Sequence, residues 1–162
     1  MHSENINFLT FTNSRPKAYA HIKGSDEYAG INGTAYFFQS KKGVIVAIQI
    51  SGLPISTTKC MNHIFAVHIH SGNECSGNDT DPFANAKMHY NPQNCNHPYH
   101  AGDIPPLFSC NGYAFSVFLT CRFEINEIIG KTIIVHSNPD DFTSQPSGNS
   151  GIKIACGEIK RH

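Results

Sequence analysis

The chain of 162 residues contains no tryptophan, and only 15 % of its residues are charged. Its twelve basic and twelve acidic side chains cancel, so the formal net charge is zero. Without an excess of positive charge, the chain lacks the electrostatic footprint of a protein that binds nucleic acid or an anionic membrane surface. It also lacks a run of about 20 apolar residues, the length that a membrane-spanning helix needs. We therefore expect neither nucleic acid nor a membrane as a partner.

The first twelve residues lack the basic n-region and the apolar h-region of a signal peptide. We therefore expect a cytoplasmic protein, with an extracytoplasmic location as the alternative if a signal was removed. The six cysteines are too few to form a disulfide scaffold, and their number leaves the redox compartment open.

A two-residue alternation of apolar and polar side chains begins at Lys17, after a polar, aperiodic arm of residues 1–16. Between Ala18 and Lys23 this alternation predicts a strand that ends at Gly24. The same reasoning predicts strands over 33–40, 44–50, 65–70, 113–120, 131–136 and 152–159, and a turn of helix over 124–129. Short connections at 41–43 and 111–112 indicate antiparallel hairpins.

Two long segments, 71–106 and 137–151, are rich in turn-forming residues and have no strand pattern. Loops of such length in a compact domain are usually functional or disordered. The chain shows almost no helical periodicity, no internal repeat and no linker. We therefore predict a single all-β domain over 17–162, an eight-stranded antiparallel Greek-key β-sandwich or barrel with two long functional loops.

Histidine is frequent, with ten residues, and six of them fall at strand ends or in one loop. His68 and His70 lie two residues apart on a predicted strand, so their side chains point to the same face. The other candidates lie in the loop 89–103 and at the end of the strand 131–136: His89, His97, His100, Asp103 and His136. Imidazoles and a carboxylate are ligand types that zinc and copper accept. The pattern predicts a metal site, with buried structural histidines and a solvated polar loop as alternatives.

Six motifs accompany these histidines along the chain. They are Phe65-Ala-Val-His-Ile-His70, Cys75, Met88-His-Tyr-Asn-Pro92, His100-Ala-Gly-Asp103, Ile134-Val-His-Ser-Asn-Pro-Asp-Asp141 and Gly148-Asn-Ser-Gly-Ile-Lys-Ile-Ala-Cys-Gly157. In order and approximate spacing, from about Ala18 to Ile159, the chain resembles the copper,zinc superoxide dismutase family. The resemblance implies an oxidoreductase that converts superoxide anion into oxygen and hydrogen peroxide.

The resemblance also implies two metal cofactors. It assigns the copper ligands to His68, His70, His89 and His136. It assigns the zinc ligands to His89, His97, His100 and Asp103. Copper would cycle between Cu(II) and Cu(I), and zinc would be structural. His89 would be catalytic as an imidazolate that bridges both ions and carries a proton.

Further residues take roles from the same resemblance. Asp140 would join a copper-ligand histidine to a zinc-ligand histidine, although a turn cap is the alternative. Cys75 and Cys156 would form a disulfide, with free thiols as the alternative. Lys153 would be the catalytic cation that guides the anion, with a plain surface charge as the alternative.

The sequence departs from the family pattern in three places. Only two residues separate His97 from His100, where the common form has a longer insert. Lys153 stands where the family usually has arginine, which keeps the charge but loses the planar fork. Four additional cysteines have no place in the pattern: Cys60, Cys95, Cys110 and Cys121. We expect that Cys110 and Cys121 do not pair with each other.

The alternative function is a non-catalytic copper carrier of the same fold. Such relatives often lack one copper-binding histidine, whereas all four are present here, which favours the enzyme. The oligomeric state is left open between monomer and homodimer.

Overall fold

The computed structural model describes residues 15–58 and 64–162. In this part of the chain, the strands are β1 (Ala18–Gly24), β2 (Asn32–Ser40), β3 (Gly43–Ser51), β4 (Ile64–Phe65), β5 (Val67–His70), β6 (Leu107–Cys110), β7 (Tyr113–Thr120), β8 (Thr132–His136), β9 (Lys153–Glu158) and β10 (Lys160–Arg161). The helical turns are η1 (Asp26–Tyr28), η2 (Ala84–Ala86) and α2 (Ile125–Ile128). None of the helices found within these described ranges is long and apolar enough to span a membrane.

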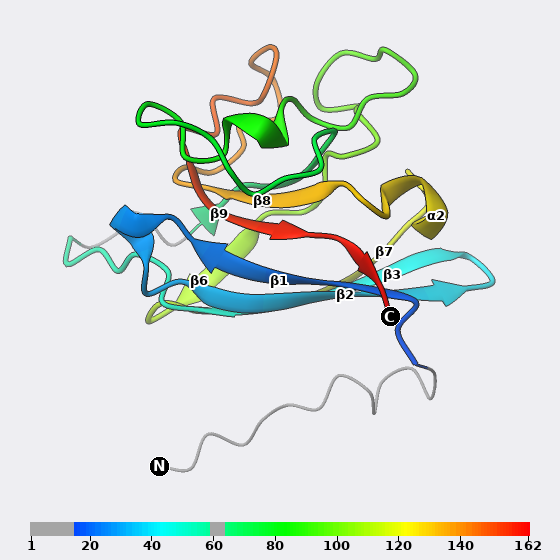
Figure 1. Ribbon diagram of the computed structural model, residues 1–162, viewed down its shortest axis with the longest axis horizontal. Coiled ribbons are helices and arrows are strands. Elements are labelled where there is room, and N and C mark those ends of the chain that lie inside the picture. Colours follow the sequence, from blue (N-terminus) through cyan, green and yellow to red (C-terminus); the bar gives the residue numbers. More distant parts are fainter. Residues whose placement is uncertain (1–14, 59–63) are drawn as a thin grey trace.

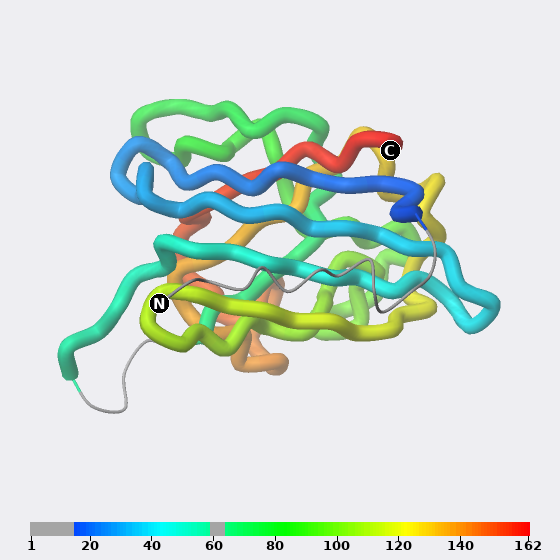
Figure 2. The backbone as a smooth tube through the Cα atoms, turned by 90° about the horizontal axis from the view of Figure 1, so that it is seen from below, coloured from blue at the N-terminus to red at the C-terminus, as the bar shows by residue number. Residues whose placement is uncertain are grey.

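The strands form one antiparallel sheet that curls into a nearly closed barrel. Their order is β4-β6-β7-β3-β2-β1-β9-β8-β5, and β10 pairs with β1. Strands β1, β2, β3 and β7 lie side by side on one side of this barrel (Figure 2). The two ends of the sheet, β4 and β5, are separated along the chain only by Ala66. The segment 64–70 therefore closes the barrel, because its first part pairs with β6 and its second part with β8.

The seven strand ranges predicted from alternation are confirmed to within one residue at each end. The segment 65–70 is divided because both backbone groups of Ala66 bond elsewhere: its N–H donates to Asn138 O, and its O accepts from His136 N–H. Two strands, β6 and β10, were not predicted as ranges, because four and two residues are too few to show a period. The described domain thus has ten strands rather than eight, in the predicted antiparallel Greek-key barrel.

The barrel interior is filled by the inward-facing apolar residues of the strands. In β1, for example, Ala18, Ala20 and Ile22 are fully buried, while Tyr19, His21 and Lys23 are not. The largest fully buried side chains include Phe37, Phe65, Ile48, Ile69, Leu107 and Ile133. Burying such a side chain contributes about 1.5–3 kcal/mol relative to leaving it exposed, so this core makes the barrel a stiff support for side chains on its outer face.

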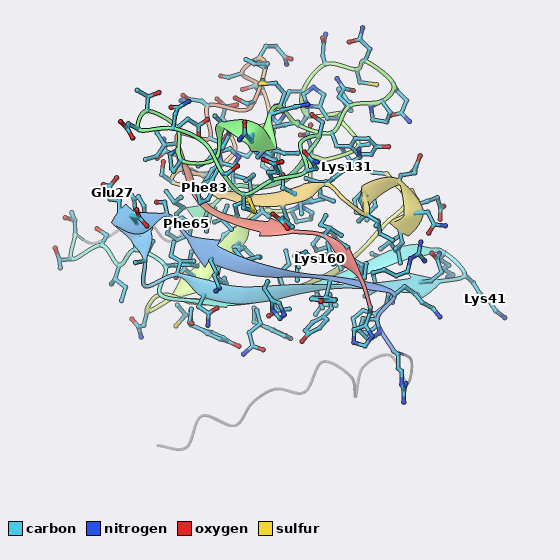
Figure 3. All side chains as sticks on the ribbon, in the orientation of Figure 1. Glu27, Lys41, Phe65, Phe83, Lys131 and Lys160 are labelled. Carbon is cyan, nitrogen blue, oxygen red and sulfur yellow. A yellow bond between two sulfur atoms is a disulfide. The ribbon has the colours of Figure 1, made fainter. Side chains whose placement is uncertain are left out.

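The two long loops lie together over β8 and β9 (Figure 1). The first loop, 71–106, is tied to β9 by the Cys75–Cys156 disulfide, whose Cα atoms are 5.6 Å apart. This confirms the expected pairing. Phe83 of the loop, labelled in Figure 3 where the loop layer meets β8 and β9, packs with Ala86, Ile134 and the two cysteines. The loop is therefore held to the barrel by both a covalent bond and a buried apolar cluster.

Candidate metal centre

Strand β5 carries the first two histidines of the centre. Val67 and Ile69 point into the barrel core, so His68 and His70 point to the opposite face, where they are 0 % and 2 % exposed. The outer edge of β5 receives the loop 89–103: Ile69 N–H donates to Gly102 O at 2.9 Å, and Tyr90 N–H donates to Ile69 O at 2.8 Å. A Cβ at Gly102 would lie 2.2 Å from Ile69 O, so only glycine allows this approach.

Four histidines form the first group of ligand atoms. Their donor nitrogens lie within 4.8 Å of one another, and all four side chains are buried: His68, His70, His89 and His136. The Nε2 atoms of His70 and His136 are 3.3 Å apart. Each of these two rings uses its Nδ1–H to donate to a backbone carbonyl, that of Lys87 at 2.8 Å and that of Gly151 at 3.4 Å. Their Nε2 lone pairs are therefore left for a cation.

Three histidines and one carboxylate form the second group: His89, His97, His100 and Asp103. The carboxylate oxygens of Asp103 lie 2.7 Å from His89 Nδ1, 3.0 Å from His97 Nδ1 and 3.3 Å from His100 Nδ1. Ligand atoms of a tetrahedral zinc ion with Zn–N bonds of about 2.0–2.1 Å are about 3.3 Å apart. The spacing of this group therefore fits zinc.

One imidazole belongs to both groups. Nδ1 of His89 lies in the second group, and its Nε2 remains for the first. Within the described residues, three buried ring nitrogens make no hydrogen bond: His68 Nδ1, His89 Nε2 and His97 Nδ1. His97 Nδ1 lies near Asp103, but its ring already donates from Nε2 to Asp140, so Nδ1 faces the carboxylate with a lone pair. Buried polar atoms are normally satisfied, and these three all face the two groups, so they fit a pair of metal ions.

Burial favours the neutral form of three histidines of the first group by lowering their pKa values. Desolvation lowers the pKa of His68 despite its hydrogen bond to Asp140. Desolvation, with the neighbouring imidazoles, lowers the pKa of His70 well below its usual value and that of His136 to about 3. For Asp103, burial alone would raise the pKa, but the surrounding histidines outweigh it and the net shift is downward. Neutral imidazoles and an ionised carboxylate are the protonation states that bind metal ions.

Asp140 connects the two groups on the side of the rings that faces away from the ligand atoms. Its Oδ2 accepts from His68 Nε2–H at 2.7 Å, and its Oδ1 accepts from His97 Nε2–H at 2.8 Å. Burial alone would raise the pKa of Asp140, but these hydrogen bonds and one from Phe142 N–H lower it to about 2. The carboxylate thus turns the Nδ1 atom of each ring toward its group, and it also caps the turn that follows it.

Two side chains that the sequence did not single out hold the short His97–His100 connection. Arg122 Nη1 donates to Pro98 O at 2.8 Å and to His100 O at 2.9 Å. Gln145, from the second long loop, forms two hydrogen bonds with the backbone of His97: its Oε1 accepts from His97 N–H at 3.0 Å, and its Nε2 donates to His97 O at 2.7 Å. These contacts place His97 in the second group without the longer insert of the family pattern.

Replacing Gln145 with alanine is expected to weaken zinc binding by about 10-fold, because residues that orient a ligand typically contribute 10- to 100-fold to metal affinity. Copper binding should change much less. The measurement is the zinc and copper affinity by chelator competition. Gln93→Ala, an exposed glutamine of the loop that carries His97, is the matched control. Equal zinc affinities in the two variants would contradict the positioning role of Gln145.

A cleft of about 490 Å³ leads from the surface to the first group. His70, His89 and His136 line its floor side, and Lys153 lies in its wall. Lys153 is the cross-strand partner of His136 between β8 and β9, which places it beside this group. Its Nζ, however, forms an ion pair with Asp81 at 2.7 Å, a contact that the sequence did not indicate.

The structure brings together every metal-ligand candidate predicted from the sequence. The additional cysteines that the structure describes do not take part. Cys95, Cys110 and Cys121 are exposed free thiols, so Cys110 and Cys121 do not pair with each other, as expected. Cys60 lies outside the described residues.

Comparison with known proteins agrees with this geometry. Residues 31–159 match the family model of copper/zinc superoxide dismutase. The chain is 31 % identical over 159 residues to superoxide dismutase [Cu-Zn] 2 of Aquifex aeolicus, covering 89 % of this chain and 86 % of the relative. It is 32 % identical over 136 residues to superoxide dismutase [Cu-Zn] of Legionella pneumophila, covering 79 % and 77 %.

Two solved structures share the fold. The copper/zinc superoxide dismutase of Brucella abortus has a TM-score of 0.73 at 21 % identity, with 89 % of this chain and 100 % of that chain covered. A double mutant of a SOD-like protein from Bacillus subtilis has a TM-score of 0.70 at 25 % identity, with 88 % and 96 % covered.

Proposed function

The chain belongs to the copper/zinc superoxide dismutase family, and from this membership we propose that its metal centre disproportionates superoxide. It is an oxidoreductase of that family, with copper and zinc as its cofactors. Two superoxide anions and two protons give one oxygen molecule and one hydrogen peroxide. The observation that carries the proposal is the complete first group of four buried histidines, three of which, His70, His89 and His136, line a cleft.

We assign copper to the first group and zinc to the second. Four imidazoles suit copper, and three imidazoles with one carboxylate at tetrahedral spacing suit zinc. When bound, copper would supply one-electron chemistry by alternating between Cu(II) and Cu(I), while zinc would keep its valence and serve a structural role. The residues in these roles are His68, His70, His89 and His136 for copper, and His89, His97, His100 and Asp103 for zinc.

The remaining chemistry is the movement of protons and the placement of the anion. His89 is the residue placed to hold and release a proton at Nε2, because that nitrogen is buried beside the cleft while Asp103 fixes its Nδ1. Lys153 offers N–H donors in the wall of the same cleft. Asp140 keeps His68 and His97 in their orientations throughout. The barrel supplies the stiff backbone from which these groups act.

The test is the metal content per chain together with superoxide dismutation by the metal-loaded protein. We expect about one copper and one zinc per chain and a catalytic rate that His136→Ala abolishes. His21→Ala, an exposed histidine on β1, is the matched control and should keep the rate. Stoichiometric copper without dismutation would instead identify a copper carrier, and copper without zinc would contradict the zinc assignment.

The disulfide bears on the compartment. Disulfides persist in oxidising compartments and are rare in the reducing cytosol. The Cys75–Cys156 bridge therefore favours an extracytoplasmic site of action over the cytoplasmic one expected from the N-terminal sequence. Both a monomer and a homodimer are compatible with the centre, since each chain carries a complete ligand set.

A further inference from the structure

The ammonium group of Lys153 is held in place by two acceptors. Its Nζ donates to Asp81 Oδ2 at 2.7 Å and to Phe83 O at 2.9 Å. The side chain of Lys153 is only 15 % exposed. An ammonium has three N–H donors, so one is left for a further acceptor. Lys153 is thus a fixed donor in the cleft wall rather than a mobile surface cation.

Asp81 is fixed independently of Lys153. Its Oδ1 accepts from Phe83 N–H at 2.9 Å, and its backbone N–H donates to the side chain of Asn78 at 3.0 Å. Its backbone O accepts from Ala84 N–H at 3.1 Å. The turn that contains these residues is anchored by the buried side chain of Phe83. The carboxylate is therefore positioned by its own loop and presented to the lysine.

The described side chains that line the cleft carry, before any metal is bound, no excess of positive charge. Three acidic residues line it, Glu27, Asp79 and Asp81, against two lysines, Lys87 and Lys153. A cleft that steers an anion by its field normally carries one sign of charge, opposite to that of the substrate. An opposite charge 2.7 Å away cancels the field of Lys153 at longer range, while its N–H donors remain available at contact.

We propose that Asp81 sets the rate and selectivity of anion capture by neutralising Lys153 at long range while fixing its ammonium in the cleft wall. In this arrangement Lys153 orients an anion that has already arrived but attracts few from solution. A small anion gains little binding free energy from the charge of Lys153 alone. The geometry of its contact with the ammonium group therefore decides which anion is retained. This inference rests on the proposed function, because it describes how the substrate of that centre is admitted.

The test compares Asp81→Asn with Asp79→Asn in the copper- and zinc-loaded protein. Both substitutions remove one negative charge from the same cleft, but only Asp81 pairs with Lys153. Asparagine keeps an acceptor for Phe83 N–H, so the turn should be preserved; metal content and thermal unfolding check this. At an ionic strength of about 10 mM, where charges act over about 30 Å, Asp81→Asn should raise the second-order rate constant for superoxide by at least about twofold.

The gain should vanish at about 1 M salt, where the Debye length is about 3 Å. Asp79→Asn should raise the rate constant for superoxide by a smaller factor. When Lys153 is also replaced by methionine, Asp81→Asn should raise the rate constant no more than Asp79→Asn does. Equal effects of the two substitutions in the wild-type background would overturn the proposal. So would a gain from Asp81→Asn that persists undiminished at about 1 M salt, because such a gain would not come from charge.

A second readout separates this inference from the proposed function. Azide titration of the Cu(II)-loaded protein, followed by its charge-transfer absorption, measures anion capture without turnover. Asp81→Asn should lower the azide dissociation constant by at least about twofold at low salt, and an unchanged constant would contradict the role of Asp81. If the wild-type protein binds azide but does not dismutate superoxide, the proposed function fails while the azide comparison still decides the role of Asp81.

Discussion

Replacing Asp140 with asparagine is expected to lower the affinity for both metals by about 10- to 100-fold, the usual cost of losing a partner that orients metal ligands. His68 and His97 each direct Nδ1 toward a ligand group, so each must donate from Nε2 to Asp140. An asparagine offers one oxygen instead of two, and its NH₂ group would face one of these N–H donors. One ring must therefore turn or lose its buried hydrogen bond. Chelator competition for zinc and for copper measures the effect.

The control for this substitution is the next residue along the chain. Asp141→Asn makes the same chemical change, but the side chain of Asp141 is exposed, and its partners among the described residues are Thr143 and Ser144. It should leave both metal affinities within about twofold, because surface changes away from the ligands have small effects. If Asp140→Asn retains both metals as tightly as Asp141→Asn does, the link between the two groups has no energetic role.

Removing the disulfide with Cys75→Ala and Cys156→Ala should destabilise the protein by up to about 4–5 kcal/mol, since the bridge closes a large loop and restricts the unfolded chain. The two cysteines are separated by 81 residues. For a chain of this length, the loss corresponds to a fall in Tm of about 10–15 °C. The fold should survive, because Phe83 and Ala86 still pack on Ile134. Thermal unfolding with and without a thiol reductant measures the fall in Tm and shows whether the variant still unfolds cooperatively.

Cys95→Ala is the matched control, because Cys95 is an exposed free thiol in the same loop. It should leave Tm unchanged and should keep the reductant sensitivity of the wild-type protein. The double variant should lose that sensitivity. A double variant that unfolds within about 2 °C of the wild type would mean that the unfolded chain gains little freedom when the bridge is absent.

Much of the fold could be predicted because it depends on local periodicity. The alternation in β1 places Ala18, Ala20 and Ile22 in the core, and the same rule places His68 and His70 together on the other face of β5. The short strands β6 and β10 escaped prediction, since too few residues carry the pattern. The boundaries of the longer strands followed from their glycines and polar turns.

The ligand set could likewise be predicted from residue type, spacing and family motif. His89, His97, His100 and Asp103 share one loop, and metal chemistry restricts which side chains in such a loop matter. The place of His97 required the structure, because it depends on Gln145, which is 48 residues away.

The sequence by itself therefore determined the strand pattern, the candidate ligand residues and the family, since each depends on neighbours in the chain or on motif order. The family motif suggested Asp140 as a link, but only the tertiary structure showed that the two rings it joins are His68 and His97 and that Lys153 is paired with Asp81. Both His68–Asp140 and Asp81–Lys153 join residues 72 positions apart. No periodicity encodes such contacts, because they arise when separate loops are packed on one barrel by the disulfide and the cluster around Phe83.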